Sequence, residues 1–133
     1  MTASTSAHLP ISDPSALSSM AEYLDDGSLN ELVVVCLADA REKSERIVAA
    51  SNSEDWPQAA QFAHDIKSTA GQMGAKRLAD IARHLEAVCN SADTRTALDM
   101  VQDLARATEA TLEAYAPHLL PEILATARQE VDD

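Results

Sequence analysis

The stretch AAQFAHDIKSTAGQMG, residues 59–74, decides the fold predicted for this chain. Its apolar side chains recur at steps of four, three, four and three residues, as they do where one face of an α-helix packs on a core. These core positions are Ala59, Ala63, Ile66, Ala70 and Met73. Gly74 follows the last of them, and glycine in the left-handed conformation commonly ends a helix. The stretch therefore predicts one amphipathic helix that ends at Gly74.

The composition extends this prediction to the whole chain. Its 133 residues include only three glycines, five prolines and, among the aromatic residues, one Trp, two Tyr and one Phe. This length favours a single domain, and few glycine and aromatic residues beside abundant Ala and Leu favour helices over strands. No proline occurs over residues 58–116. We therefore expect an all-α fold, an antiparallel up-down four-helix bundle with additional short terminal helices.

Start and stop signals divide the chain into helices. Asp13 before Pro14 favours a first short helix that ends near Gly27, and Ser28 with Glu31 forms a capping box at the start of a second helix. Residues 1–12 are expected to form a flexible N-terminal tail, and residues 13–131 a single bundle domain. The expected helices cover about 13–25, 28–51, 57–74, 75–90 and 95–116, with a short helical tail after Pro117.

The net charge of -12 excludes several classes of partner. Duplex nucleic acid and anionic membranes both require a basic surface, so neither is expected to bind. The longest apolar run, residues 32–38, is too short to span a bilayer, and residues 1–10 do not resemble a secretory signal. These features favour a cytoplasmic protein with reduced cysteines. We also expect the chain to be a monomer.

A second pattern on the helix of residues 59–74 points to chemistry. On a wheel of about 100° per residue, His64 and Lys67 lie one turn apart on a face outside the core stripe. A neutral imidazole, with an ordinary pKa of about 6.5, is a nucleophile at neutral pH, and an ammonium group can hold negative charge beside it. Phosphoryl transfer needs just this positioning and charge neutralisation. The small residues around the pair are Ala60, Ser68 and Gly71.

Gly71 has two interpretations. Glycine inside a helix costs about 1 kcal/mol relative to alanine, so its presence needs a reason. It either allows a partner's backbone to come close to His64, or it belongs to an early helix terminus together with Gly74.

Basic residues also gather near this helix. The only acidic residues over 61–84 are Asp65 and Asp80. This stretch is either a docking area for an acidic partner or an ordinary solvated face of alternating charge. Its cations are Lys67, Lys76, Arg77 and Arg83.

The segment HDIKSTAGQMG, residues 64–74, resembles the signature of histidine-containing phosphotransfer (HPt) domains. His64 matches the phosphorylated histidine, Lys67 the lysine one turn later, and Gly71 and Gly74 the small residues that follow. Ser68 stands where the family often has glycine. Leu85 with Glu86 is similar to the family's leucine and polar residue on the next helix, which implies that Glu86 orients the imidazole.

The resemblance implies a phosphotransfer intermediate without autokinase activity. It would accept a phosphoryl group reversibly on His64 from a receiver-domain aspartate and pass it to another receiver. The implied partners are response-regulator receiver domains and a hybrid histidine kinase, and this chain would bind no cofactor, because magnesium would be held by the receiver. Residues expected to contact the partner are Ala60, Ser68, Gly71, Gly74, Lys76, Arg77 and Arg83.

Two alternatives of a different class stay open at this point. One is a non-catalytic helical interaction module, and the other is an isolated dimerisation bundle of a sensor kinase. The second also carries an exposed helical histidine, often with an acidic residue after it, as Asp65 follows His64.

Overall fold

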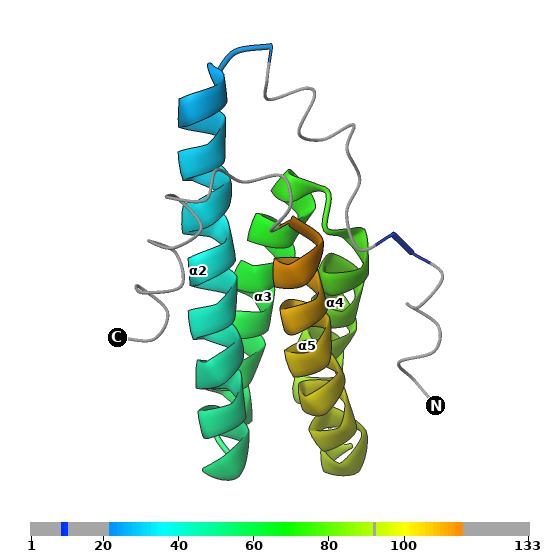
Figure 1. Ribbon diagram of the computed structural model, residues 1–133. Coiled ribbons are helices and arrows are strands. Elements are labelled where there is room, and N and C mark those ends of the chain that lie inside the picture. The colour runs from blue at the N-terminus through cyan, green and yellow to red at the C-terminus, as the bar shows by residue number, and fades with distance from the viewer. Residues whose placement is uncertain (1–8, 11–21, 92, 116–133) are drawn as a thin grey trace.

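In the computed structural model, the described part of the chain folds into four helices (Figure 1). The structure describes residues 9–10, 22–91 and 93–115. The helices are α2 (Asp26–Asn52), α3 (Trp56–Met73), α4 (Lys76–Cys89) and α5 (Thr94–Tyr115). No strand occurs within the described ranges, so the prediction of an all-α fold is confirmed for them.

The four helices enclose one core, because each packs on two others. Helix α3 packs on α2 and α4, and α5 packs on α4 and α2, so the contacts close a ring. Figure 1 shows the connections between successive helices at alternating ends of this ring. All five core positions predicted on α3 are buried. The apolar stripe of residues 59–74 therefore faces the core, as its spacing requires.

Helix α3, which carries His64, begins at a local signal that the sequence shows. The Asp55 side chain accepts a hydrogen bond from the backbone N–H of Gln58 at 3.3 Å, and Pro57 occupies the first turn. A carboxylate there satisfies one of the N–H groups that have no partner inside the helix, and proline has no N–H to lose. The predicted start of this helix is confirmed.

The other end of α3 is fixed by Gly74. Its φ of 81° is left-handed, and its N–H bonds to the Ala70 carbonyl in the turn that leads to α4. The buried Tyr115 hydroxyl of α5 donates to the Met73 carbonyl at 2.6 Å, which satisfies another carbonyl at this end. The predicted stop at Gly74 is confirmed, and the long-range cap from Tyr115 adds to it.

Helix α2 corrects the predicted start of the second helix. Its N-cap is Asp25, whose side chain accepts the Ser28 N–H at 2.7 Å, and the helix begins at Asp26. The capping box at Ser28 is therefore wrong, and Gly27 lies inside the helix rather than in a turn. The physical reason is that the Asp25 carboxylate is as good a cap as a serine hydroxyl and stands three residues earlier. Residues 22–24 are likewise turn and bend, and Asp25 is the extended N-cap, so none of them ends a short helix.

The predicted short helix before residue 22 and the helical tail after Pro117 lie outside the described residues. So does most of the predicted N-terminal tail. Of that tail, the carbonyls of Leu9 and Pro10 accept hydrogen bonds from the Nε and the backbone N–H of Arg77, each at 3.0 Å. These bonds serve the first turn of α4, where Ala75 provides no side-chain cap.

None of the helices in the part of the chain that the structure describes is both long enough and apolar enough to cross a membrane.

Candidate functional site

One carboxylate joins the histidine and the lysine that the sequence singled out. Glu86 of α4 places Oε2 3.1 Å from Nδ1 of His64 and Oε1 3.0 Å from Nζ of Lys67. Both α3 residues therefore contact different oxygens of the same α4 side chain. The three side chains form a compact group that we call the His64 cluster.

Helices α3 and α4 place His64 and Glu86 at a similar distance from the turn that joins the two helices. His64 lies ten residues before Gly74 and Glu86 lies twelve residues after it. At about 1.5 Å per residue, both therefore lie about 15–18 Å from the turn that joins α3 to α4. Lys67 lies one turn from His64 on the same side of α3, so its ammonium reaches the same carboxylate. The short turn at Gly74 thus sets the register of the cluster.

The contact with Glu86 defines the chemistry of the imidazole. An ionised carboxylate only accepts hydrogen bonds, so Nδ1 is the ring nitrogen that carries the proton and donates. The lone pair of neutral His64 then lies on Nε2, the nitrogen farther from the backbone. The His64 side chain is 51% exposed, whereas Glu86 is 27% exposed. The nucleophilic nitrogen belongs to an accessible side chain, and the orienting group is more deeply placed.

The lysine keeps the carboxylate ionised. The hydrogen bond from Lys67 lowers the pKa of Glu86 below its ordinary value; burial acts in the opposite direction, and the hydrogen bond from His64 lowers the pKa further. Lys67 is itself 35% exposed and half-buried beside the ring. The cluster thus combines a nucleophile, a negative charge that orients it and a positive charge nearby.

The small residues predicted around His64 divide into two groups. Ser68 and Gly71 are exposed, as expected. Gly71 lies in the last turn of α3, which continues to Met73, and its carbonyl accepts the Gly74 N–H at 3.3 Å. A Cβ built at Gly71 would meet nothing within 4 Å, so tight packing in the fold does not account for this glycine.

Ala60 corrects the prediction, because it is only 8% exposed and belongs to the core. The wheel assumed one buried stripe, but α3 packs on both α2 and α4, so its buried arc is wider. Gly74 is buried as well, at the helix cap. Neither residue offers an exposed side chain to a partner.

Comparison with known families agrees with this geometry. The Hpt domain family matches residues 31–133, which is most of the chain and includes the whole His64 cluster. The chain belongs to the Hpt domain family. Members of this family take part in histidine phosphotransfer in two-component phosphorelays and interact with receiver domains. Neither the curated proteins nor the solved structures compared with the chain match it.

The basic stretch of this Hpt domain is less positive than its sequence indicates. Lys67 is paired with Glu86, and Arg83 is paired with Asp80 at 2.8 Å. The Nε of Arg77 donates to the Leu9 carbonyl. Lys76 and Arg83 remain exposed, while Arg77 is half-buried. These contacts favour a face of alternating charge over a strongly basic patch.

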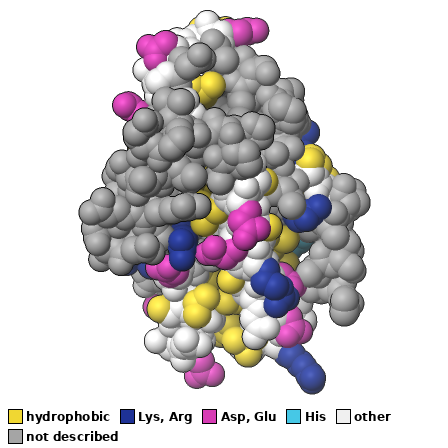
Figure 2. All heavy atoms as spheres, viewed as in Figure 1, with side chains coloured by type: hydrophobic (Ala, Val, Ile, Leu, Met, Phe, Trp, Pro, Cys, Tyr) yellow, Lys and Arg dark blue, Asp and Glu magenta, His cyan; other side chains and the backbone are white. Residues whose placement is uncertain are grey.

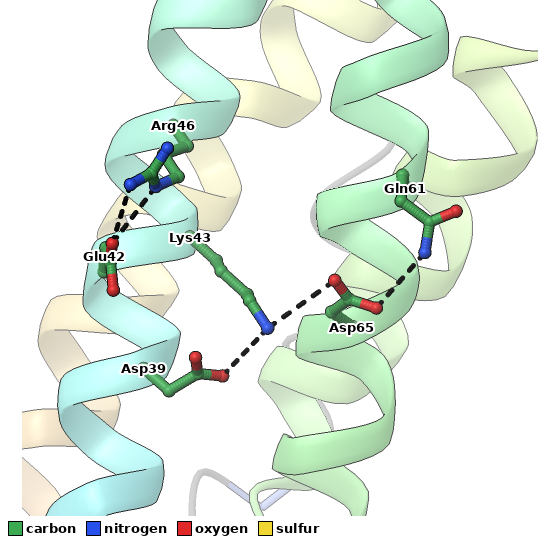
Figure 3. A network of polar contacts seen from close by, with 6 residues as sticks. All are labelled: Asp39, Glu42, Lys43, Arg46, Gln61 and Asp65. Carbon is green, nitrogen blue, oxygen red and sulfur yellow. Dashed lines mark hydrogen bonds and ion pairs between the residues drawn. The ribbon is translucent and has the colours of Figure 1, made fainter.

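A second charged group, which links α2 to α3, was missed by the sequence reasoning (Figure 3). Lys43 of α2 extends between Asp39, at 3.3 Å, and Asp65 of α3, at 3.5 Å. Gln61 donates to the other Asp65 oxygen at 3.3 Å. We call these residues the Lys43 cluster. The i,i+4 spacing of Asp39 and Lys43 was visible in the sequence, but the contact with Asp65 depends on how α2 packs on α3.

On the face drawn in Figure 2, acidic, basic and hydrophobic side chains are interspersed over the lower part of the bundle. Arg41 of α2 reaches Glu109 of α5 at 3.3 Å, which ties these two helices together across the surface. Such exposed ion pairs contribute little individually. The helices that carry the His64 cluster are α3 and α4.

Proposed function

We propose that this Hpt domain accepts a phosphoryl group on Nε2 of His64 from the aspartyl phosphate of one receiver domain and passes it to the aspartate of another. The observation that carries the proposal is the bridging carboxylate of Glu86, which orients His64 and holds Lys67 beside it. The other histidine of the described residues, His84, also shares a carboxylate with a basic residue, because Asp80 contacts His84 at 3.5 Å and Arg83 at 2.8 Å. It differs from His64 in that Arg83 also lies 3.0 Å from its Nε2, so this nitrogen already has a neighbour in the fold.

The transfer step needs a nucleophile, an aligned phosphorus atom and neutralisation of the moving charge. The lone pair of Nε2 attacks the phosphorus of the acyl phosphate, an N–P bond forms, and the P–O bond to the receiver's carboxylate breaks. The released carboxylate stays on the receiver. The proton stays on Nδ1 and donates its hydrogen bond to the Glu86 carboxylate, which stabilises the positive charge that the ring acquires.

Lys67 contributes the cation of this chain. Its Nζ lies beside the ring, where it can turn toward the oxygens of the phosphoryl group. Magnesium belongs to the receiver's acidic pocket in this proposal, and the chain itself needs neither a nucleotide nor autokinase activity. The residues proposed to contact the receiver are now the exposed ones, Ser68, Gly71, Lys76 and Arg83, together with the half-buried Arg77.

We also propose that the chain is a monomer. A dimerisation bundle completes its core with helices of a second chain, whereas here four helices of one chain close the ring. The short connections between these helices also support the antiparallel up-down order. The short terminal helices stay part of the prediction.

Labelling of His64 tests the proposal. Incubation with a phosphorylated receiver domain should place an acid-labile, alkali-stable phosphoryl group on the wild-type chain, and His64→Gln should abolish it. His84→Gln is the matched control and should keep the label, because His84 is a half-buried histidine of α4 outside the cluster. Circular dichroism should show equal helicity in both variants. Persistent labelling of folded His64→Gln would refute the assignment.

A further inference from the structure

The first turns of α2 extend beyond the end of α3 (Figure 1). Lys43 of α2 contacts Asp65 of α3, and the two helices run in opposite directions. Eight residues from this contact, toward the same end of the bundle, lie Val35 on α2 and Met73, the last residue of α3. Because both helices rise by about 1.5 Å per residue, Val35 and Met73 lie at a similar height. Helix α2 therefore passes the end of α3 at Val35.

The described part of α5 ends at the same height. Arg41 of α2 contacts Glu109 of α5. Val35 and Tyr115, the last described residue of α5, each lie six residues from that contact. The hydrogen bond between the Tyr115 hydroxyl and the end of α3 agrees with this height. Residues 26–34 of α2, which we call the α2 overhang, therefore project about 13 Å beyond the described ends of α3 and α5.

Apolar side chains are exposed along the α2 overhang. Leu32 is 38% exposed, and Val35 at the base of the overhang is 61% exposed. Leu24 and Tyr23, just before the helix, are exposed as well. The two helices that pack on α2 end at the height of Val35, so within the described ranges neither of them lies opposite these turns. A group of exposed apolar side chains of this kind marks a surface that binds another segment or protein.

The C-terminal segment of this chain has the position and the length to cover the α2 overhang. Residues 116–133 lie outside the described residues, and they follow Tyr115 at the base of the overhang. Pro121 favours the first turn of a helix, and a helix over 121–131 would be about 16 Å long, close to the length of the overhang. Its apolar residues recur at helical spacing, at Ile123, Leu124, Ala127 and Val131.

The C-terminal segment is favoured over the chain that leads into α2. The Hpt family matches residues 31–133, so the domain includes the whole C-terminal segment. Residues 11–21 lie outside that match. The C-terminal segment also has five Leu, Ile, Val and Met residues, against three in residues 11–21. It therefore brings more apolar surface to bury against the overhang.

We propose that residues 121–131 form a helix that packs on the α2 overhang and covers Leu32. This helix completes the bundle beyond the ends of α3 and α5. The inference goes beyond the proposed function, because the overhang begins about 13 Å along α3 from His64. It also supplies a reason for a monomeric chain, since a covered apolar face offers no site to a second copy.

A double-mutant cycle in the full chain, measured by urea unfolding, tests this inference. Leu32→Gln should raise the unfolding equilibrium constant about fivefold in the wild-type chain, because an apolar contact with the C-terminal helix is lost. In a chain that already carries Ile123→Gln and Leu124→Gln, the same change should raise the constant less than about twofold, since the contact is already absent.

Leu98→Gln is the matched control. Leu98 is 44% exposed, similar to Leu32, but it lies in the second turn of α5 at the other end of the bundle. Its effect on the unfolding equilibrium constant should be the same in the wild-type chain and in the chain with Ile123→Gln and Leu124→Gln.

Additive effects of Leu32→Gln and the two C-terminal substitutions would overturn the inference, and would leave the overhang to residues 11–21 or to a partner protein. A coupling that grows with protein concentration would also overturn it, because a second copy would then cover the overhang. Labelling of His64 is a separate measurement, and its failure would refute the proposed function without touching this inference.

Discussion

Helix α3 takes part in two charged clusters. In one of them a cation is shared between two acids, and in the other an acid is shared between two basic groups. In the Lys43 cluster one ammonium lies between two carboxylates, Asp39 and Asp65, and ties α2 to α3. In the His64 cluster one carboxylate, Glu86, lies between an ammonium and an imidazole, and ties α3 to α4. The difference lies in what is left exposed.

The Lys43 cluster holds its ammonium between two carboxylates, so this cation is already paired within the fold. The His64 cluster instead leaves a half-exposed imidazole whose second nitrogen contacts no group of the cluster. Adjacent residues of a helix point about 100° apart, which is why His64 and Asp65 enter different clusters. One cluster is built to join helices, and the other also presents a nucleophile.

The largest expected effect separates the two lysines. Lys67→Ala should slow transfer from a phosphorylated receiver to His64 by about tenfold to a hundredfold, because the moving phosphoryl group loses the cation beside the ring. Lys43→Ala should change the rate less than about twofold, since Lys43 faces Asp39 and Asp65. Quenched time courses of labelling measure both rates. Equal rates in the wild type and Lys67→Ala would remove Lys67 from the mechanism.

A smaller effect is expected at Gly71, which lies about 20° from His64 on the wheel and so on the same side of α3. Gly71→Ala should raise the free energy of unfolding by about 0.5–1 kcal/mol, because the added methyl meets nothing within 4 Å. The same change should slow transfer, because the receiver must approach this face closely. Urea unfolding and labelling kinetics measure the two quantities.

Gly27→Ala is the matched control, since Gly27 lies in α2 and its added Cβ would make only an ordinary 3.5 Å contact with Asp25. It should leave the transfer rate unchanged. Transfer by Gly71→Ala at the wild-type rate would show that the glycine does not serve the partner's approach.

The smallest expected effects are changes in stability with pH. The contribution of Glu86 to stability should be lost at acid pH, and that of Lys43 at alkaline pH. The hydrogen bond from Lys67 lowers the pKa of Glu86, so the stability contributed by Glu86 is full above its ordinary value of 4.5 and is lost as the pH falls through the lowered folded value. Burial lowers the pKa of Lys43, but hydrogen bonds and charges from Asp39 and Asp65 outweigh this and raise it overall. The contribution of Lys43 to stability is full below its ordinary pKa of 10.5 and is lost as the pH rises through the raised pKa of the folded state.

Each contribution should amount to less than about 1 kcal/mol, because the groups are partly exposed. Urea unfolding of the wild type, Glu86→Gln and Lys43→Met across the pH range measures both. The stability difference of Glu86→Gln from the wild type should shrink at acid pH, and that of Lys43→Met at alkaline pH. Differences that stay constant with pH would contradict the assignment of charge to these groups.

Most of α3 was predictable because its signals are local. The apolar spacing, the Asp55 cap before Pro57 and the stop at Gly74 each act within a few residues. The start of α2 could not be predicted in this way, since Asp25 and Ser28 are both good N-caps and local rules do not choose between them. Ala60 was misplaced because a wheel shows one helix, whereas burial depends on how many helices pack on it.

The site was partly predictable for a similar reason. His64 and Lys67 are one turn apart on a single helix, and their resemblance to the Hpt signature identified them together. The predicted basic stretch is less positive in the structure than along the chain, because pairing with Glu86 and Asp80 neutralises two of its cations. Charge counted along a chain does not show which opposite charges the fold brings beside it.

The sequence by itself determined most of the helices, the exposed histidine with its nearby lysine, and the family, because periodicity, caps and motif spacing are properties of neighbouring residues. The tertiary structure decided which acid meets which base. Glu86 reaches His64 from another helix, while the adjacent Asp65 turns to Lys43. Those contacts depend on the register and rotation of packed helices, which the core as a whole fixes and no single segment encodes.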